Sequence, residues 1–402
     1  MRLLSFASIA ALTITAFSSS AAPSTTPQTL ASANTGFAFK LLNEVAKEQP
    51  AQNIFISPYS VSTVLQMVGN GAGGKTRDEL RKVLGTTDLT PAAANEAARD
   101  INRAITGGCT NVVLNSANAI WYRKGIQVKP EFLACNRDFF QAAVDPLNFD
   151  DPAAVGIMNS WVSQMTHGRI PSIVSGPIDP LTRLFLANAV YFKGKWLDPF
   201  EAKATKSRPF HLQGGQRKNL LMMEQSKKFT YRRGTGYQAV RLPYMDWDLA
   251  MYVFLPDAGS SPQKLLAIMN ADSWQRITLP GFSEQEGHLV LPRFKLQYGI
   301  DLQKPLKALG ITNAFQPEKA DFSGMTVEPV FISEATQKTF LEVNEEGTEA
   351  AATTMMNVAS AGPAMNPPKP FEMIVDRPFL VIIHHAATQS ILFMGVVFDP
   401  GA

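Results

Sequence analysis

The segment from residue 378 to 398 reads PFLVIIHHAATQSILFMGVVF, and it predicts a hairpin of two buried strands. Strands this apolar must be covered on both faces, so they need partners from earlier in the chain. The 402-residue length would also allow two or three domains of common size. The hairpin instead favours one domain of mixed α/β class.

Other runs of the sequence predict the elements around this hairpin. Apolar residues concentrate in four further candidate strands, at 111–122, 183–192, 248–256 and 288–298. Helical spacing of apolar residues marks three segments, at 37–48, 130–144 and 155–168. Ser57 followed by Pro58 predicts the start of another helix, which the glycines at 69 and 71 end, and a further helix is expected from Thr76. We find no internal repeat.

The charge of the chain excludes some classes of partner. It carries 37 basic and 34 acidic residues, a formal net charge of +3, and they are mixed along the sequence. A nucleic-acid binder would show a basic patch or stripe, so we expect no nucleic-acid partner. After the N-terminal segment no run is long and apolar enough to span a bilayer, so we expect no membrane partner either.

The N-terminal segment predicts export. Arg2 precedes an apolar run to about Phe17, and small residues follow at 18–21. This is the pattern of a secretory signal peptide cleaved after Ala21, and the alternative is a buried N-terminal helix. We expect a signal peptide at 1–21, a mature domain at 22–402, and an extracellular or periplasmic protein. Such a compartment permits a disulfide between Cys109 and Cys135, although two buried thiols are equally compatible with the sequence.

One short motif points to a different function. Residues 69–76, GNGAGGKT, fit the pattern of a phosphate-binding loop. A working loop of this kind follows a buried strand, whereas here an amphipathic helix precedes the glycines. We therefore interpret the segment as a turn between two helices and expect no nucleotide cofactor.

Other signatures of catalysis are missing. The histidines lack metal-ligand spacing, and no serine lies in a G-x-S-x-G elbow. The paired histidines in the C-terminal hairpin are expected to be structural. The five histidines are His167, His211, His288, His384 and His385. We expect neither an enzyme nor a metal or cofactor site.

Residues 345–362, EEGTEAAATTMMNVASAG, carry an unusual period-two pattern. In steps of two from Thr348 to Ser360, every side chain is small or uncharged, so this face could enter a core. The segment lacks the large branched residues of a committed strand, and prolines follow from Pro363. On the residues alone, an exposed loop or a helix is an equal alternative.

Four stretches of the chain resemble the serpin family, in the order in which the family has them. They are NIFISPYSVSTVLQMVGNGAGGKTRDEL at 53–80, FLANAVYFKGKW at 185–196, EEGTEAAAT at 345–353 and DRPFLVIIHHAATQSILFMGVVFDP at 376–400. The resemblance, which covers about residues 30 to 400, implies a large central β-sheet, smaller sheets, surrounding helices and an exposed reactive-centre loop at about 345–371. It also implies an inhibitory suicide substrate: a serine protease cleaves the loop, the loop enters the main sheet, and the acyl-enzyme is trapped.

The resemblance carries individual roles to residues of this chain. The hinge of the loop matches Glu345, Gly347, Thr348, Ala350, Ala351 and Ala352. Trp196 matches the aromatic residue of the breach, where insertion begins, and Ser57, Ser60 and Asn188 match the polar shutter cluster beneath the opening strands. The family usually adds a histidine to that cluster, but this chain has Gln337 there. An amide can still bond Asn188, although it cannot sense pH.

The spacing of the family places the reactive bond between Ala361 and Gly362. The loop is longer than is common, so the bonds 360–361, 364–365 and 365–366 stay open as alternatives. Alanine before the cut favours an elastase-like or subtilisin-like protease with a small apolar pocket. We expect a monomeric protein. The alternative function is a non-inhibitory serpin that acts as a binding or chaperone module, which the small hinge residues disfavour.

Overall fold

The computed structural model describes residues 26–107, 112–246, 248–348 and 369–401. Eight α-helices lie in these ranges: α1 (Thr26–Glu48), α2 (Pro58–Gly69), α3 (Gly74–Leu84), α4 (Pro91–Thr106), α5 (Pro130–Phe140), α6 (Ala153–Met165), α7 (Pro262–Ile268) and α8 (Gln303–Leu309). Four short helical turns accompany them: η1 (Ala202–Ala204), η2 (Ser273–Thr278), η3 (Leu279–Gly281) and η4 (Asn313–Phe315).

The strands form two sheets. The six-stranded sheet has the order β10 (Phe294–Asp301), β11 (Ile332–Asn344), β12 (Gly347–Thr348), β4 (Leu184–Lys195), β2 (Val112–Arg123) and β3 (Ala143–Leu147). The nine-stranded sheet has the order β1 (Ile54–Ile56), β15 (Ser390–Val397), β14 (Phe379–His385), β8 (Leu249–Pro256), β7 (Tyr237–Pro243), β6 (Arg217–Gly234), β9 (Ser283–Pro292) and β13 (Phe371–Ile374), with β5 (Lys206–His211) paired to β6.

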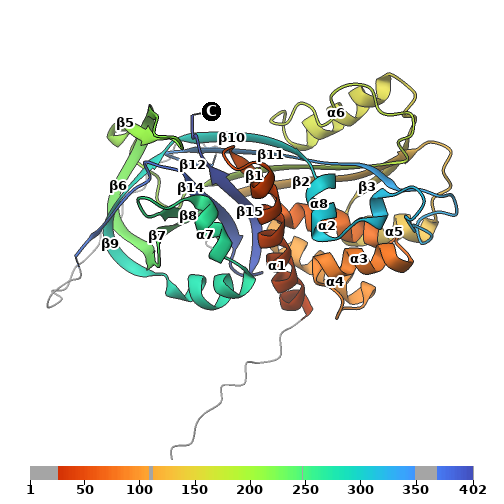
Figure 1. The fold of residues 1–402 in the computed structure, drawn as a ribbon, viewed down its shortest axis with the longest axis horizontal. Helices are drawn as coiled ribbons and strands as arrows, with labels where there is room; N and C mark the ends of the chain where they lie inside the picture. The colour runs from red at the N-terminus through yellow and green to blue at the C-terminus, as the bar shows by residue number, and fades with distance from the viewer. Residues whose placement is uncertain (1–25, 108–111, 247, 349–368, 402) are drawn as a thin grey trace, which may run out of the picture.

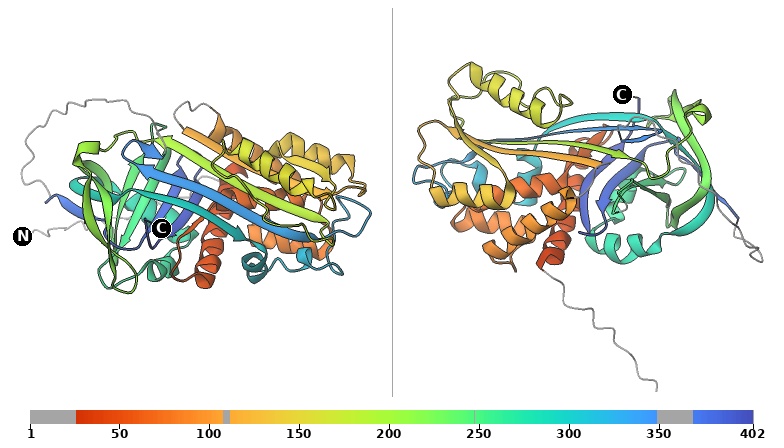
Figure 2. Two further views of the ribbon diagram at one scale, coloured as in Figure 1. Left: turned by 90° about the horizontal axis from the view of Figure 1, so that it is seen from above. Right: turned by 180° about the vertical axis from the view of Figure 1, so that it is seen from behind.

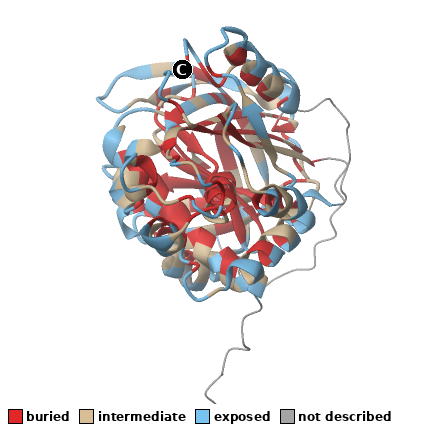
Figure 3. Ribbon diagram, turned by 90° about the vertical axis from the view of Figure 1, so that its right-hand side faces the viewer, coloured by how far each residue is buried: buried red, intermediate tan, exposed pale blue. Residues whose placement is uncertain are grey.

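The helices divide between the two faces of the six-stranded sheet. Figure 1 shows this sheet nearly edge-on, with α6 above it and α1 to α5 and α8 below. Seen from above, the long strands lie side by side and α6 covers part of them (Figure 2). Buried residues concentrate where the strands meet the helices, and exposed residues form the outer surface (Figure 3). The chain therefore forms one mixed α/β domain, as predicted.

The local signals in the sequence were mostly correct. The side chain of Ser57 caps α2 by accepting a hydrogen bond from the backbone N–H of Ser60, and α2 ends at Gly69 as expected. The helix expected from Thr76 begins two residues earlier, at Gly74. The C-terminal hairpin is confirmed as β14 and β15, whose residues are all buried.

Several boundaries were wrong, and the helix expected at 37–48 begins already at Thr26. The run 288–298 was expected to be one strand, but β9 ends at Pro292 and β10 begins at Phe294 in the other sheet. Proline has no N–H with which to continue a ladder, so the chain changes sheets there. The helix expected to reach residue 144 ends at Phe140, because Gln141 adopts a left-handed conformation with φ 51°. The strands β3, β5 to β7, β11 and β13 lie where no strand was predicted.

Candidate functional site

The centre of the six-stranded sheet is a seam between two parallel strands. β11 pairs directly with β4 from Ile332 opposite Leu184 to Phe340 opposite Tyr191. Parallel strands give slightly less stable pairing per residue than antiparallel ones. Beyond Tyr191 and Phe340 the two strands separate, and another piece of chain lies between them.

That piece is β12, which lies within the predicted hinge. Gly347 and Thr348 pair antiparallel with Asn344 and Val343 of β11 and, on the other side, with Lys195 and Gly194 of β4. Thr348 is fully buried. These two residues of the period-two segment thus already occupy a strand position inside the sheet.

Gly347 is required at this point by its backbone and its surroundings. Its φ is +147°, where side chains are rarely tolerated, and a Cβ would lie 2.2 Å from the carbonyl oxygen of Gly194. A glycine therefore lets the chain turn from β11 into the gap between the strands.

The hinge rests on two stacked aromatic side chains. The rings of Trp196 and Tyr244 are 4.6 Å apart and 14° from parallel. The indole N–H of Trp196 donates to the carbonyl oxygen of Asn344 at 3.0 Å, and its backbone N–H donates to that of Glu346 at 2.9 Å. The hydroxyl of Tyr244 shares a 2.9 Å hydrogen bond with that of Thr348. Trp196 thus holds the chain before the hinge, whereas Tyr244 holds the hinge itself.

Glu345 anchors the turn that leads into β12. Its carboxylate accepts hydrogen bonds from Thr205 and from Arg293, whose guanidinium nitrogen lies 2.6 Å away, and the carboxylate side chain is 8% exposed. Burial alone raises the pKa of Glu345, but the bonds from Arg293 and Thr205 outweigh it, so the net pKa is lowered. The charged form is therefore the stable one in the folded protein.

The predicted shutter residues meet below the seam. The amide oxygen of Gln337 accepts from the backbone N–H of Ser57 at 3.0 Å, and its nitrogen donates to the Ser57 carbonyl at 3.0 Å and to Asn188. Asn188 in turn donates to Ser60 and, at 2.5 Å, to Asn118. Gln337 thus binds the start of α2 through both atoms of its amide.

Two members of this cluster were not predicted. Ser116 and Asn118 both lie on β2, and both contact the hydroxyl of Ser60, at 2.6 Å and 3.0 Å. Their alternation along an expected strand placed them on one face, but nothing in the sequence assigned that face to the cluster. The complete network connects α2, β2, β4 and β11, so it crosses the seam.

Several predicted residues lie outside the described ranges. These are Ala350, Ala351, Ala352, Ala361, Gly362 and Cys109. Cys135 is half-buried on α5, where its sulfur accepts a 3.3 Å hydrogen bond from Asn95, and burial, followed by the charge of Asp138, raises the pKa of its thiol. The expected reactive bond and the question of a disulfide are therefore not addressed by the structure.

The segment that matched a phosphate loop contacts a distant segment of the protein itself. Gly73 donates its backbone N–H to the backbone carbonyl of Asp321 at 2.9 Å, and the backbone N–H of Asp321 donates to the hydroxyl of Thr76 at 3.0 Å. The carboxylate of Asp321 lies against Gly73, where a Cβ would be 2.6 Å from it. The carboxylate of Asp321 thus lies beside Gly73, the residue that precedes α3.

Within the described ranges, no group of three or more His, Cys, Asp or Glu side chains is placed to hold a metal ion. No helix in the described part of the chain is long and apolar enough to cross a membrane.

Known proteins resemble the chain over nearly its whole length. Residues 32–400 match the family described as Serpin (serine protease inhibitor). The leukocyte elastase inhibitor of Bos taurus is 38% identical over 92% of this chain and 99% of its own. The crystal structure of native protease nexin-1 with heparin superposes with a TM-score of 0.82 at 32% identity, covering 93% of this chain and 100% of that one.

A further solved structure shows that the fold alone does not select one activity. Human thyroxine-binding globulin complexed with its ligand superposes with a TM-score of 0.86 at 26% identity, over 94% of this chain and 100% of its own. The family itself follows from the matched span and from the identity to the elastase inhibitor. The chain belongs to the serpin family of serine protease inhibitors, and it is not an enzyme.

Proposed function

We propose that this protein is an exported, monomeric inhibitor that traps serine proteases by inserting its cleaved loop between β4 and β11. The observation that carries the proposal is β12, which is already paired with both strands. Antiparallel pairing on both sides means that a longer insert replaces one parallel ladder by two antiparallel ladders. The gain of a second ladder, and of antiparallel in place of parallel pairing, favours the inserted state.

The register of β12 supports continuation along the seam. If this register continued, each loop residue after Thr348 would lie one position further back on both strands, so Ala350 would oppose Phe192 and Leu341, and Ala352 would oppose Val190 and Thr339. These strand residues are buried on the inner face of the sheet. The even-numbered face of the loop, which is small or uncharged, is therefore the one that would be buried.

The same register gives the length of the insert. Thr354 would oppose Asn188 and Gln337 in the shutter, and Val358 would reach Leu184, the first residue of β4. This end lies three positions before Ala361, so the proposed reactive bond is just beyond the inserted strand. At 3.3 Å per residue, a protease attached there would be carried about 35 Å along the sheet.

The target that we propose is a serine protease with a small apolar pocket, because alanine precedes the proposed bond. The decisive experiment incubates the protein with elastase, subtilisin, chymotrypsin and trypsin. We expect SDS-stable complexes with the first two and a released C-terminal peptide that begins at Gly362. A peptide that begins at Ala361, Met365 or Asn366 would move the bond, and cleavage without any complex would favour the non-inhibitory alternative.

Export is tested separately by the mature N-terminus. If residues 1–21 are a signal peptide, the secreted protein begins at Ala22. Mass spectrometry of the protein from culture medium measures this. Retention of Arg2 in the mature chain would contradict the proposal.

A further inference from the structure

The point where β4 and β11 separate is marked by two aromatic side chains. Tyr191 and Phe340 are the last pair in direct register across the seam, and both are almost fully buried. Their ring centroids are 6.3 Å apart, with the planes tilted by 42°. The pair therefore joins the strands at the position where β12 would have to extend.

A segment after α6 covers this pair from outside. We name residues 167–172 the post-α6 strap. Arg169 places its guanidinium 5.7 Å from the centre of the Phe340 ring and hydrogen-bonds the hydroxyl of Tyr191. One arginine thus contacts both sides of the seam at the point where it opens.

Further contacts hold the strap across the sheet. His167 lies 2.7 Å from the amide nitrogen of Asn115 on β2, and its ring packs edge-on against Tyr191 at 6.0 Å. At the other end, Lys338 of β11 reaches Ser172 at 3.5 Å. The strap therefore contacts β2, β4 and β11 together, on the face of the sheet that α6 covers in Figure 1.

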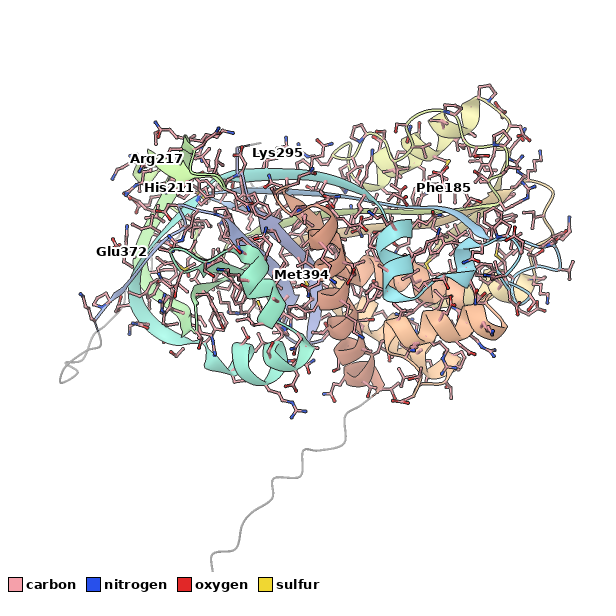
Figure 4. The ribbon with its side chains drawn as sticks, viewed as in Figure 1. Phe185, His211, Arg217, Lys295, Glu372 and Met394 are labelled. Carbon is pink, nitrogen blue, oxygen red and sulfur yellow. The ribbon has the colours of Figure 1, made fainter. Side chains whose placement is uncertain are left out.

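A second cation faces the same ring. Lys295 of β10 lies 5.2 Å from the centre of the Phe340 ring, and Figure 4 shows it on the α6 side of the sheet. Lys295 contacts only the β11 member of the pair, whereas Arg169 contacts both members. The contacts of Arg169 can therefore all be made only while β4 and β11 are adjacent.

If the register of β12 continued, an inserted strand would pass between the rings of Tyr191 and Phe340. Ala351 would oppose Tyr191 on one side and Phe340 on the other. With a strand between them, the two backbones would move from about 4.8 Å to about 9.6 Å apart. The rings would then lose contact, and Arg169 could not retain both partners.

We propose that Tyr191, Phe340 and Arg169 form a clasp that holds the seam closed just below the hinge and sets the rate of loop insertion. The inference rests on the insertion mechanism of the proposed function. In this proposal the strap controls when the loop inserts, because the clasp must open before Ala351 can enter the sheet. Arg169 acts here as a positioning residue.

The test measures the rate at which a labelled peptide of residues 348–361 enters the sheet of the intact protein, by native gel. Phe340→Leu is expected to accelerate incorporation roughly fivefold, and Arg169→Gln about threefold, as expected for loss of an aromatic pair and of a cation–π contact. In the double variant the acceleration should be smaller than the product of the two single accelerations, because both substitutions remove the same contact between Arg169 and Phe340.

Two matched control variants carry the same types of substitution, Phe to Leu and Arg to Gln, at positions away from the seam. Phe315→Leu removes a buried ring that faces Lys307 at 5.5 Å, and Arg99→Gln removes a guanidinium 5.3 Å from the Phe139 ring. Both should incorporate peptide at the wild-type rate. If Phe315→Leu accelerated incorporation as much as Phe340→Leu, the effect would be due to general destabilisation, and the clasp proposal would be wrong. Arg169 is exposed, so its variant folds even if Phe340→Leu does not.

The two proposals fail in different ways. If wild-type protein incorporates peptide but Arg169→Gln and Phe340→Leu do so no faster, only the clasp is refuted. If the wild type takes up no peptide and gains no thermal stability when its loop is cleaved, the insertion mechanism fails, and the clasp fails with it.

Discussion

The hydroxyl of Tyr244 lies 2.9 Å from that of Thr348, although the two residues are 104 positions apart in sequence. This contact holds the buried side chain of Thr348 inside the sheet. Under the proposed mechanism, Thr348 stays buried when the loop inserts, so the position must remain small and uncharged. The side chain at 348 therefore decides whether the hinge can enter at all.

Thr348→Arg should convert the inhibitor into a substrate. Burial of an unpaired charge costs several kcal/mol, so we expect the yield of SDS-stable complex to fall about tenfold or more while cleavage continues. Thr348→Val is the control, since it removes only the hydroxyl and should retain most inhibition. Normal complex formation by the arginine variant would contradict insertion of the hinge.

Glu345→Gln should weaken the turn before the hinge. The substitution removes a charged hydrogen-bonding partner of Arg293, which we expect to lower the free energy of unfolding by about 1–2 kcal/mol. Because the pKa of Glu345 is lowered in the folded state, its contribution is present above the unfolded pKa and is lost as pH falls through the folded one. Urea unfolding from pH 7 to pH 3 should therefore show a difference between the two proteins that shrinks on acidification. A constant difference would contradict this.

Gln337→His should make the shutter sensitive to pH. The described members of the cluster are serine, asparagine and glutamine side chains, none of which titrates between pH 5 and 8. Burial without an acidic partner favours the neutral imidazole, so the pKa of the folded variant should lie below that of the unfolded chain. The variant should lose stability relative to the wild type as pH falls below about 6.5. Parallel unfolding curves at pH 8 and pH 5.5 would rule this out.

His384 should reduce stability in acid. Burial chiefly, then the charges of His385 and Arg241, lower the pKa of His384 to about 3, and these effects outweigh a hydrogen bond to the backbone of Gln389 that raises it. A pKa below the unfolded value means that stability is lost as pH falls from about 6.5 towards 3, by about 3 kcal/mol between pH 7 and pH 4.

His384→Phe tests this assignment. The ring of His384 packs edge-on against Tyr252 and Trp274, so phenylalanine preserves the contacts and removes the titration. The variant should show a flatter dependence of urea stability on pH over this range. A variant whose curve stays as steep as that of the wild type would contradict the assignment.

The corner at residues 69–76 should depend on Asp321 and not on Lys75. Asp321 meets the corner from a distant segment through its backbone, and its pKa is lowered, first by the hydroxyl of Ser323 and then by the backbone N–H of Ser323. Asp321→Ala should lower the midpoint of urea unfolding, because it removes the carboxylate that accepts a hydrogen bond from the Ser323 backbone N–H, an interaction worth about 1 kcal/mol. Lys75→Ala should change neither stability nor inhibition. Loss of inhibition in the lysine variant would reopen the question of a nucleotide.

Local signals predicted what depends on neighbours in sequence. Ser57 and Pro58 predicted the start of α2, and the apolar runs predicted the C-terminal hairpin. The contacts of the hinge were beyond such signals. Arg293 and Glu345 are separated by 52 positions, and Tyr244 lies in a region with no strand prediction.

Family resemblance supplied part of what the pattern lacked. It assigned Trp196 to the breach and Gln337 to the shutter; in the structure Trp196 bonds Asn344, and Gln337 bonds Ser57 and Asn188. It did not identify Ser116, Arg169 or Phe340, whose neighbours are set by how strands and the strap pack together. Which residues share a face can be read from alternation, but which face meets which partner depends on the whole fold.

The double pairing of β12 divides the loop between two sets of requirements. The side chains of residues 349–358 would be restricted by the sheet, because they must fit between the two flanking strands. The side chains nearer Ala361 would be restricted by the pocket of the protease. Target preference could therefore change through substitutions around 359–362 without altering the machinery that does the trapping, and an engineer could redirect the inhibitor in the same way.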